Sequence, residues 1–175
     1  MGVTEQLARA AIETPGSRLD GAAMESARLR ILDGIATMIA GSREDSTLAA
    51  LRMARHLGGT PRASVMGHPD RTSAPLAGFV NGMAAHSQEY DDFTKGVTHV
   101  TVSMVPGALA LAEDAGVSGR RLLEGFIVGF EVGSRIVRGL RPALFDRGWH
   151  PNGMVGALGI ATAGARMLDF DLRQT

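Results

Sequence analysis

Apolar residues recur every three or four positions along most of this 175-residue chain, which is the spacing that places them on one face of an α-helix. Short runs rich in glycine, proline, serine and threonine separate these segments and are typical of helix ends and loops. We therefore expect an all-α chain: a compact domain of about six helices behind a short amphipathic N-terminal segment. The segment is predicted over 3–13, the helices over 20–40, 45–57, 73–90, 103–115, 118–140 and 154–168, a loop or very short strand over 60–69, and a loop over 141–153.

Several predicted helix starts carry residues that favour the first turn of a helix. Asp20 and Ser118 are expected to cap their helices, because short polar side chains accept hydrogen bonds from the first amides. Pro75 and Pro106 are placed in the first turns of theirs, where proline is tolerated. The whole of 1–175 is expected to form one domain, since this length supports a single core.

Glycine is abundant, with 23 residues, and much of it falls inside the apolar segments. Gly125, Gly129 and Gly133 stand four residues apart and predict a smooth helix face for close contact with another helix. Glu131 and Arg135 lie on the same helix and argue against a membrane-dimer motif. The Ala/Gly-rich helix over 154–168 is expected to be buried on all sides.

Charge and composition exclude several classes of protein. Eighteen basic residues balance eighteen acidic ones, so no global field attracts nucleic acid or an anionic membrane. There is no cysteine, which excludes thiolate metal sites and cysteine nucleophiles. The N-terminus lacks the features of a signal peptide, and the longest uncharged run, over 151–165, is too short to span a bilayer. We expect a soluble cytoplasmic protein that binds neither nucleic acid nor membrane.

The stretch AAHSQEYDDFTKGVTHV, residues 84–100, concentrates the candidate chemistry. His86 and Glu89 share a helix face at i, i+3 and could contribute to a metal site, but helical bundles need a second such pair. The sequence therefore favours a packed or hydrogen-bonded His86 and no metal. Asp91 and Asp92 follow at a predicted helix C-terminus, where carboxylates oppose the helix dipole. This stretch is an active-site wall or a solvated helix end.

Two further histidines are expected in loops that lead into apolar helices. His99 lies between Thr98 and Thr101, and His150 lies in the segment GWHPNG. Histidine suits proton transfer near neutral pH, and a following helix start offers unpaired amides to an anionic substrate. His56 and His68 lack such surroundings and are predicted to be surface residues.

The order and spacing of several blocks resemble the MmgE/PrpD family. The matching blocks are GFVNGMAAHSQEYDD at 78–92, His99, VPGALALAEDAGVSGRRLLEGFIVGFEVGSRI at 105–136 and RGWHPNGMVGALGIATAGARMLDFD at 147–171. The resemblance covers nearly the whole chain. It implies a cofactor-free lyase or isomerase that acts on small di- or tricarboxylates by dehydration, decarboxylation or epimerisation.

The resemblance also implies which residues line the site. His99, His150 and Asp91 match its catalytic positions, and the substrate-binding positions match Glu89, Asp92 and Thr94. The chain departs from the family pattern by having Glu89 in place of a common aspartate, Phe93 in place of a common threonine, and Val100 in place of a proline after the histidine. The family also uses lysines from later in its longer chains, whereas this sequence contains only Lys95.

Family members are more than twice as long, so the chain resembles only the first part of their helical domain. Little or no activity is therefore expected from these 175 residues alone. Apolar helix faces that a complete domain would cover are expected to drive association into a homodimer or with a partner chain. The rival hypothesis is a non-catalytic helical remnant or interaction module.

Overall fold

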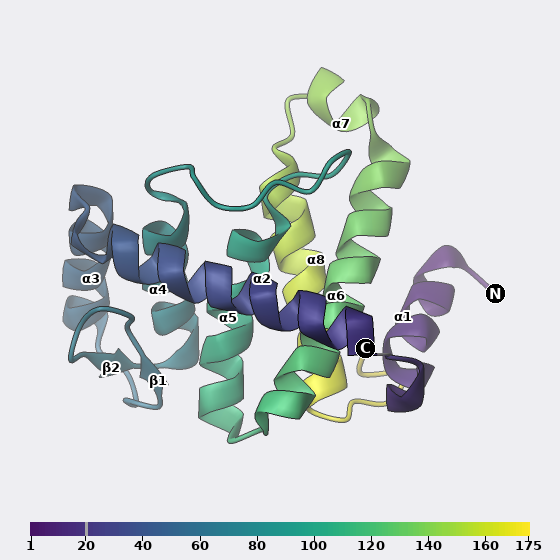
Figure 1. Cartoon of the computed structure of the whole chain (residues 1–175), viewed down its shortest axis with the longest axis horizontal. Helices are drawn as coiled ribbons and strands as arrows, with labels where there is room; N and C mark the ends of the chain where they lie inside the picture. The colour runs from purple at the N-terminus through teal and green to yellow at the C-terminus, as the bar shows by residue number, and fades with distance from the viewer. Residues whose placement is uncertain (20) are drawn as a thin grey trace.

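The computed structural model describes residues 1–19 and 21–175, and it is built almost entirely of helices (Figure 1). The expected cap at Asp20 lies outside the described residues. The elements are α1 (Val3–Glu13), η1 (Gly16–Arg18), α2 (Gly21–Ala40), η2 (Gly41–Arg43), α3 (Asp45–Leu57), β1 (Ala63–Ser64), β2 (Arg71–Thr72), α4 (Ala74–His86), α5 (Val100–Ala115), α6 (Gly119–Leu140), α7 (Ala143–Asp146) and α8 (Pro151–Met167).

The all-α prediction is confirmed, although the described residues form eight α-helices instead of about six. The four-residue helix α7 lies inside the segment that was predicted to be a loop, and it was too short to show a hydrophobic period. The segment 60–69, predicted as a loop or a very short strand, contains the two-residue strand β1, which pairs antiparallel with β2, so that Ala63 faces Thr72. In the described ranges no helix is long and apolar enough to cross a membrane.

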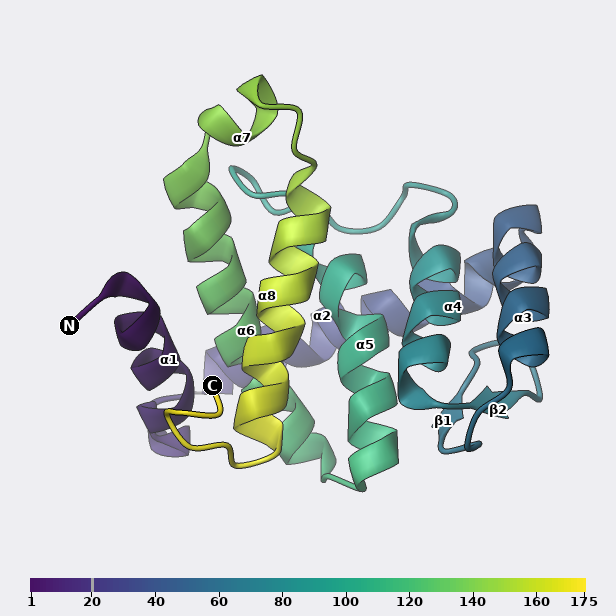
Figure 2. The same cartoon turned by 180° about the vertical axis from the view of Figure 1, so that it is seen from behind.

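Helix α5 forms the centre of the domain. In Figure 2 it stands between α4 and α8, and α2 crosses the opposite face of the molecule, as Figure 1 shows. Its buried side chains, including Val100, Met104 and Val105, join one core cluster with Met38 of α2 and Phe126 of α6. Burying such side chains contributes about 1.5–3 kcal/mol each, so the core fixes both ends of the loop that carries the candidate site.

The glycine face of α6 packs closely on α8, as the four-residue spacing predicted. A Cβ atom on Gly125 would lie 2.7 Å from Cγ of Met167, and one on Gly133 would lie 2.9 Å from Cγ2 of Val155. A Cβ atom on Gly129 would meet the backbone oxygen of Gly159. We call this contact between α6 and α8 the glycine seam; it exists because neither backbone is held away by side chains.

Two helix boundaries at the candidate site differ from prediction. Helix α4 ends at His86 instead of about Tyr90, because Ser87 closes the last turn: its backbone amide and its hydroxyl both donate to the carbonyl of Ala84. Helix α5 begins at Val100 instead of Ser103. Its first residues are β-branched and have low helix propensity, but burial of Val100 outweighs that preference.

Two further predictions about helices were wrong. Pro106 lies inside α5 and not in its first turn. Helix α8 begins at Pro151 and not at residue 154, and it is not buried on all sides, since Leu158 is 40% exposed. An Ala/Gly-rich composition shows that a helix packs closely on some face, but it does not show how many faces are covered.

Candidate active site

The candidate site is organised by the loop over 87–99, which connects α4 to α5. In Figures 1 and 2 this loop extends from the top of α4 towards α6 and then returns to the start of α5. Backbone bonds close its second half, where the amide of Thr94 donates to the carbonyl of Thr98 (3.0 Å) and the amide of Val97 donates to the carbonyl of Thr94 (2.9 Å). The loop therefore holds its side chains against the helix core.

A buried carboxylate joins two histidines at the two ends of this loop. Asp91 has a fully buried side chain, with Oδ1 3.0 Å from Nδ1 of His86 and Oδ2 2.7 Å from Nδ1 of His99. A carboxylate only accepts, so each Nδ1 donates the proton of its hydrogen bond. Each imidazole thereby directs Nε2 away from Asp91. A histidine held in this way by a carboxylate is suited to accept a proton at Nε2.

The two rings and a neighbouring aromatic ring pack together. The ring centres of His86 and His99 are 5.1 Å apart, and Phe93 meets His99 edge-on with ring centres 5.2 Å apart. His99 retains 25% side-chain exposure and His86 retains 34%. Both imidazoles are therefore held by protein contacts and still reach solvent.

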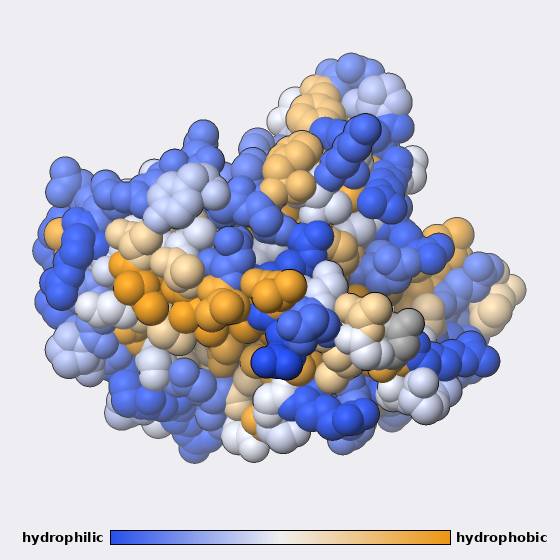
Figure 3. All heavy atoms as spheres, viewed as in Figure 1, coloured by the Kyte–Doolittle hydropathy of each residue, from blue (hydrophilic) through white to orange (hydrophobic). Residues whose placement is uncertain are grey.

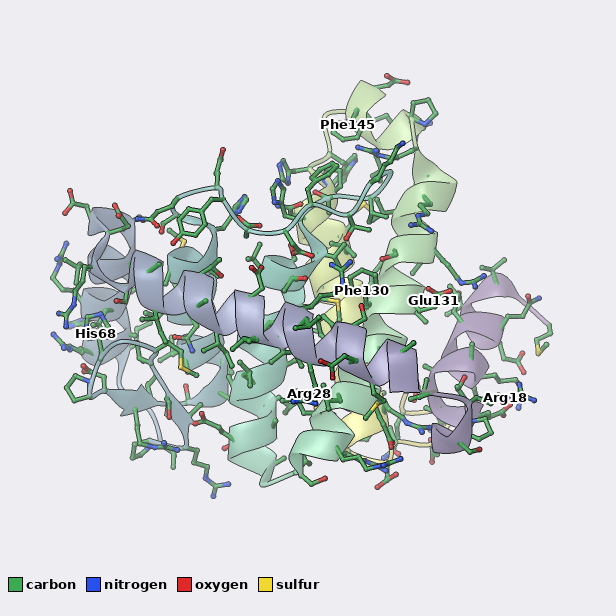
Figure 4. All side chains as sticks on the ribbon, in the orientation of Figure 1. Arg18, Arg28, His68, Phe130, Glu131 and Phe145 are labelled. Carbon is green, nitrogen blue, oxygen red and sulfur yellow. The ribbon has the colours of Figure 1, made fainter. Side chains whose placement is uncertain are left out.

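Asp92 faces the opposite helix α2. It forms an ion pair with Arg30, whose guanidinium carbon lies 4.8 Å from the centre of the Phe130 ring. Figure 4 shows Phe130 where α2 crosses α6. Oδ1 of Asp92 is buried and has no hydrogen-bond partner within the described residues. Asp92 thus secures the loop to α2 through Arg30, and its second carboxylate oxygen is buried without a partner among the described residues.

His150 is the N-cap residue of α8. Its side chain is exposed, and Nδ1 accepts a hydrogen bond from the backbone amide of Asn152 at 3.3 Å. No hydrogen bond or ring contact joins His150 to His99 across residues 1–19 and 21–175. The link between the two helix starts is the hydrogen bond from the Thr98 hydroxyl to Oδ1 of Asn152.

The remaining predicted residues differ in their placement. Glu89 is exposed and has a φ of 53°, an uncommon conformation for a non-glycine residue. Thr94 holds its hydroxyl buried without a hydrogen-bond partner in the part of the chain that the structure describes. The structure therefore brings together His99 and Asp91, places Asp92 beside them in the chain, and leaves Glu89 turned to solvent.

Three residues of this arrangement were missed or undervalued by sequence reasoning. His86 was expected to be packed or hydrogen-bonded, and it is hydrogen-bonded to Asp91. Arg30 was missed because it lies 62 residues before its partner Asp92. Asn152 carried a weak signal, since it follows His150 in a helix-start segment.

A groove opens beside His86 between α4, α5 and α8. Its volume is about 370 Å³, and it continues into a larger apolar groove of about 580 Å³ along the same three helices. Helices α4, α5 and α8 stand side by side in Figure 2. Polar groups enter it from His86, Ser103 and Asn152. The rest of its lining is small or apolar: Gly82, Val102, Gly153, Gly156, Ala157 and Ile160.

The His–Asp–His cluster also has the composition of a metal site. One ligand atom from each of His86, Asp91 and His99 can be chosen so that all three lie within 4.8 Å of one another. The pair of His86 and Glu89, which the helix spacing suggested, is not this cluster, because α4 ends at His86 and Glu89 is exposed. The nitrogen–oxygen distances of 2.7 and 3.0 Å are ordinary hydrogen-bond lengths.

The described residues form an all-helical domain in which a buried aspartate binds a histidine at a helix start. Its sequence matches the MmgE/PrpD N-terminal domain over residues 5–175, and the chain belongs to that family. Among similar proteins, cis-aconitate decarboxylase of Homo sapiens is 30% identical over 172 residues, and the match covers 95% of this chain and 36% of the human protein.

Other relatives are similar to this chain over most of its length. Cis-aconitate decarboxylase of Mus musculus is 31% identical over 159 residues, which cover 87% of this chain and 32% of the mouse protein. The cis-aconitate decarboxylase-like protein oryM of Aspergillus oryzae is 28% identical over 175 residues, covering 95% and 36% respectively. The chain thus spans about a third of the length of these relatives.

Proposed function

We propose that this chain is the N-terminal helical part of a cofactor-independent lyase or isomerase that acts on a small polycarboxylate. The observation that carries the proposal is the hydrogen bond of 2.7 Å between Asp91 and Nδ1 of His99, at the start of α5, in a member of the MmgE/PrpD family. In this role Asp91 orients His99, and Nε2 of His99 takes or returns the proton α to a substrate carboxylate.

The developing negative charge needs stabilisation as well as a base. The start of α5 has no side-chain cap, so its first amides are available to an anionic group. The buried Thr94 hydroxyl, which has no partner among the described residues, is proposed to donate to a substrate carboxylate. Asp92 is proposed to orient the loop through Arg30, with Glu89 at the rim and His150 as the second proton-transfer residue. Arg30 of α2 contacts this loop but is already paired with Asp92.

The proposal predicts binding without efficient turnover. Adding cis-aconitate to the purified chain should shift the backbone amide resonances of residues 91–99 and of the start of α8 in a saturable way. Turnover, followed as loss of the cis-aconitate signal, should be slight or undetectable, because few cationic groups face the site. His99→Ala should abolish the shifts, whereas His56→Ala, on α3, should leave them unchanged.

Two results would contradict this scheme. Resonance shifts confined to other helices would remove the substrate site from the loop. Rapid consumption of cis-aconitate by the chain alone would show that the described residues suffice for catalysis.

A second candidate function, an interaction module that associates with a partner chain, is supported by an exposed apolar strip on α2. Leu29, Leu32 and Ile39 are 59%, 63% and 54% exposed, and Figure 3 shows hydrophobic residues gathered along this helix. Contiguous apolar patches on a protein surface mark interaction sites. A second copy of the chain is the proposed occupant, through pairing of the two α2 strips.

Self-association is therefore expected to depend on this strip. The molar mass measured by light scattering should rise from monomer towards dimer as the protein concentration increases. The double substitution Leu29→Lys and Leu32→Lys should hold the protein as a monomer, because charges would be buried in the paired strip. Leu57→Lys, at a residue that is also 63% exposed but lies on α3, is the matched control. A wild-type chain that stays monomeric throughout would exclude this assembly.

A further inference from the structure

We propose that His86 is a positioning residue for His99 and acts through Asp91. The consequence for catalysis rests on the proposed function, in which His99 transfers the proton. His86 lies within the family-like block over 78–92 but is not among the predicted catalytic or substrate-binding residues. The structure places it at the last position of α4, with Nδ1 3.0 Å from the carboxylate that holds His99.

The carboxylate of Asp91 is shared between two rings. Oδ1 binds His86 and Oδ2 binds His99, and no other side-chain hydrogen bond or ion pair of Asp91 occurs within residues 1–19 and 21–175. The last torsion of an aspartate is broad and roughly two-fold, so one hydrogen bond alone sets its orientation weakly. Two bonds in different directions fix the plane of the carboxylate and hence the direction of Nδ1–H of His99.

Asp91 itself lies in a loop, and His86 connects it to a helix. Of the two histidines, His99 immediately precedes α5 and His86 ends α4, so the three side chains form a bridge between two core helices. Without the His86 donor, Oδ1 of Asp91 would be a fully buried acceptor with no partner. A buried unpaired acceptor costs about 1–3 kcal/mol, and rotation of the carboxylate away from His99 relieves that cost.

The exposure of His86 separates this role from ordinary core packing. Its side chain is 34% exposed and lines the groove between α4, α5 and α8. A histidine that only filled space would not keep a third of its side chain in contact with solvent.

The test is to measure which ring nitrogen of His99 carries the proton, by long-range ¹H–¹⁵N correlation spectra of the chelator-treated protein. In the wild type, His99 and His86 should both be protonated at Nδ1. His86→Leu removes the donor, and His99 should then lose its single Nδ1-protonated state and show a mixture of tautomers. His86→Asn places an amide N–H near the position of Nδ1 and should restore the wild-type signal of His99.

His56→Asn is the matched control and should leave the His99 signal unchanged. An unaltered His99 signal in His86→Leu would overturn the proposal, as would a wild-type signal that changes on removal of a bound metal ion. If His86→Leu does not fold, Asp91→Asn serves instead, and it should alter the signals of both histidines together. A change in the signal of only one histidine would overturn the inference that the two share the Asp91 carboxylate. These readouts need no substrate, so failure to bind cis-aconitate would refute the proposed function and leave this result standing.

Discussion

Replacing Gly129 by valine is expected to lower the free energy of unfolding by more than about 3 kcal/mol, a large share of the stability of a typical domain. A Cβ atom at this position would contact the backbone oxygen of Gly159, and it would lie 2.8 Å from Cε of Met104 and 3.0 Å from Cβ of Ala163. The backbone oxygen cannot rotate away as a side chain can, so α6 and α8 must separate. Urea denaturation followed by circular dichroism measures the loss.

The matched control for this substitution is Gly139→Val on the same helix. Nothing lies within 4 Å of a Cβ atom placed on Gly139, and valine has a higher helix propensity than glycine. Its stability should therefore be unchanged or slightly raised. Equal losses in the two variants would mean that β-branching, and not the close approach of α8, determines the effect.

Replacing Glu124 by alanine is expected to cost about 3 kcal/mol, because it would leave a buried guanidinium without its carboxylate. Glu124 of α6 lies between Arg120, at 3.1 Å, and Arg166 of α8, at 3.5 Å. The side chain of Arg166 is only 12% exposed, and it also donates to the carbonyl of Ile12 at 2.9 Å. Removing the Glu124 carboxylate should therefore weaken the packing of α1 as well as that of α8.

Glu131→Ala provides the comparison for Glu124→Ala. Glu131 also pairs with an arginine four residues away on α6, at 2.6 Å, but its side chain is 55% exposed and lies on the outer side of the helix (Figure 4). Exposed pairs of this kind contribute little, so stability should change by less than about 0.5 kcal/mol. Hydrogen exchange of α1 amides distinguishes the two variants, since only Glu124→Ala should accelerate it; similar exchange in both would contradict the role of burial.

The fold was predictable where one physical preference dominated. The spacing of Gly125, Gly129 and Gly133 predicted a close contact between helices. Glycine destabilises a helix interior, so its repeated use indicates that a larger side chain would not fit there. The start of α5 was not predictable, because the β-branched residues near Val100 have low helix propensity. Only their burial in the tertiary structure outweighs that preference. Helix α7 was missed because four residues carry no period.

The candidate site was predictable in its residue types and only partly in its geometry. The importance of Asp91 and His99 was inferred from a local cluster and from family resemblance, and the structure places them in hydrogen-bond contact. The pairing of His99 with His150 as an acid–base pair stays a prediction. Long-range partners such as Arg30 with Asp92, and Thr98 with Asn152, could not be derived, because a linear sequence does not state which helix starts meet.

The glycine seam also fixes the position of α8 along its axis, and with it the position of the residues at the start of α8. Its contacts run in antiparallel order, with Gly125 against Met167, Gly129 against Gly159 and Gly133 against Val155. Sliding α8 by one turn would move its first residues by about 5.4 Å and carry Asn152 beyond the reach of the Thr98 hydroxyl. The alignment of the loop over 87–99 with the start of α8 thus depends on glycines of another helix, α6, whose missing side chains fix how far along its axis α8 is seated.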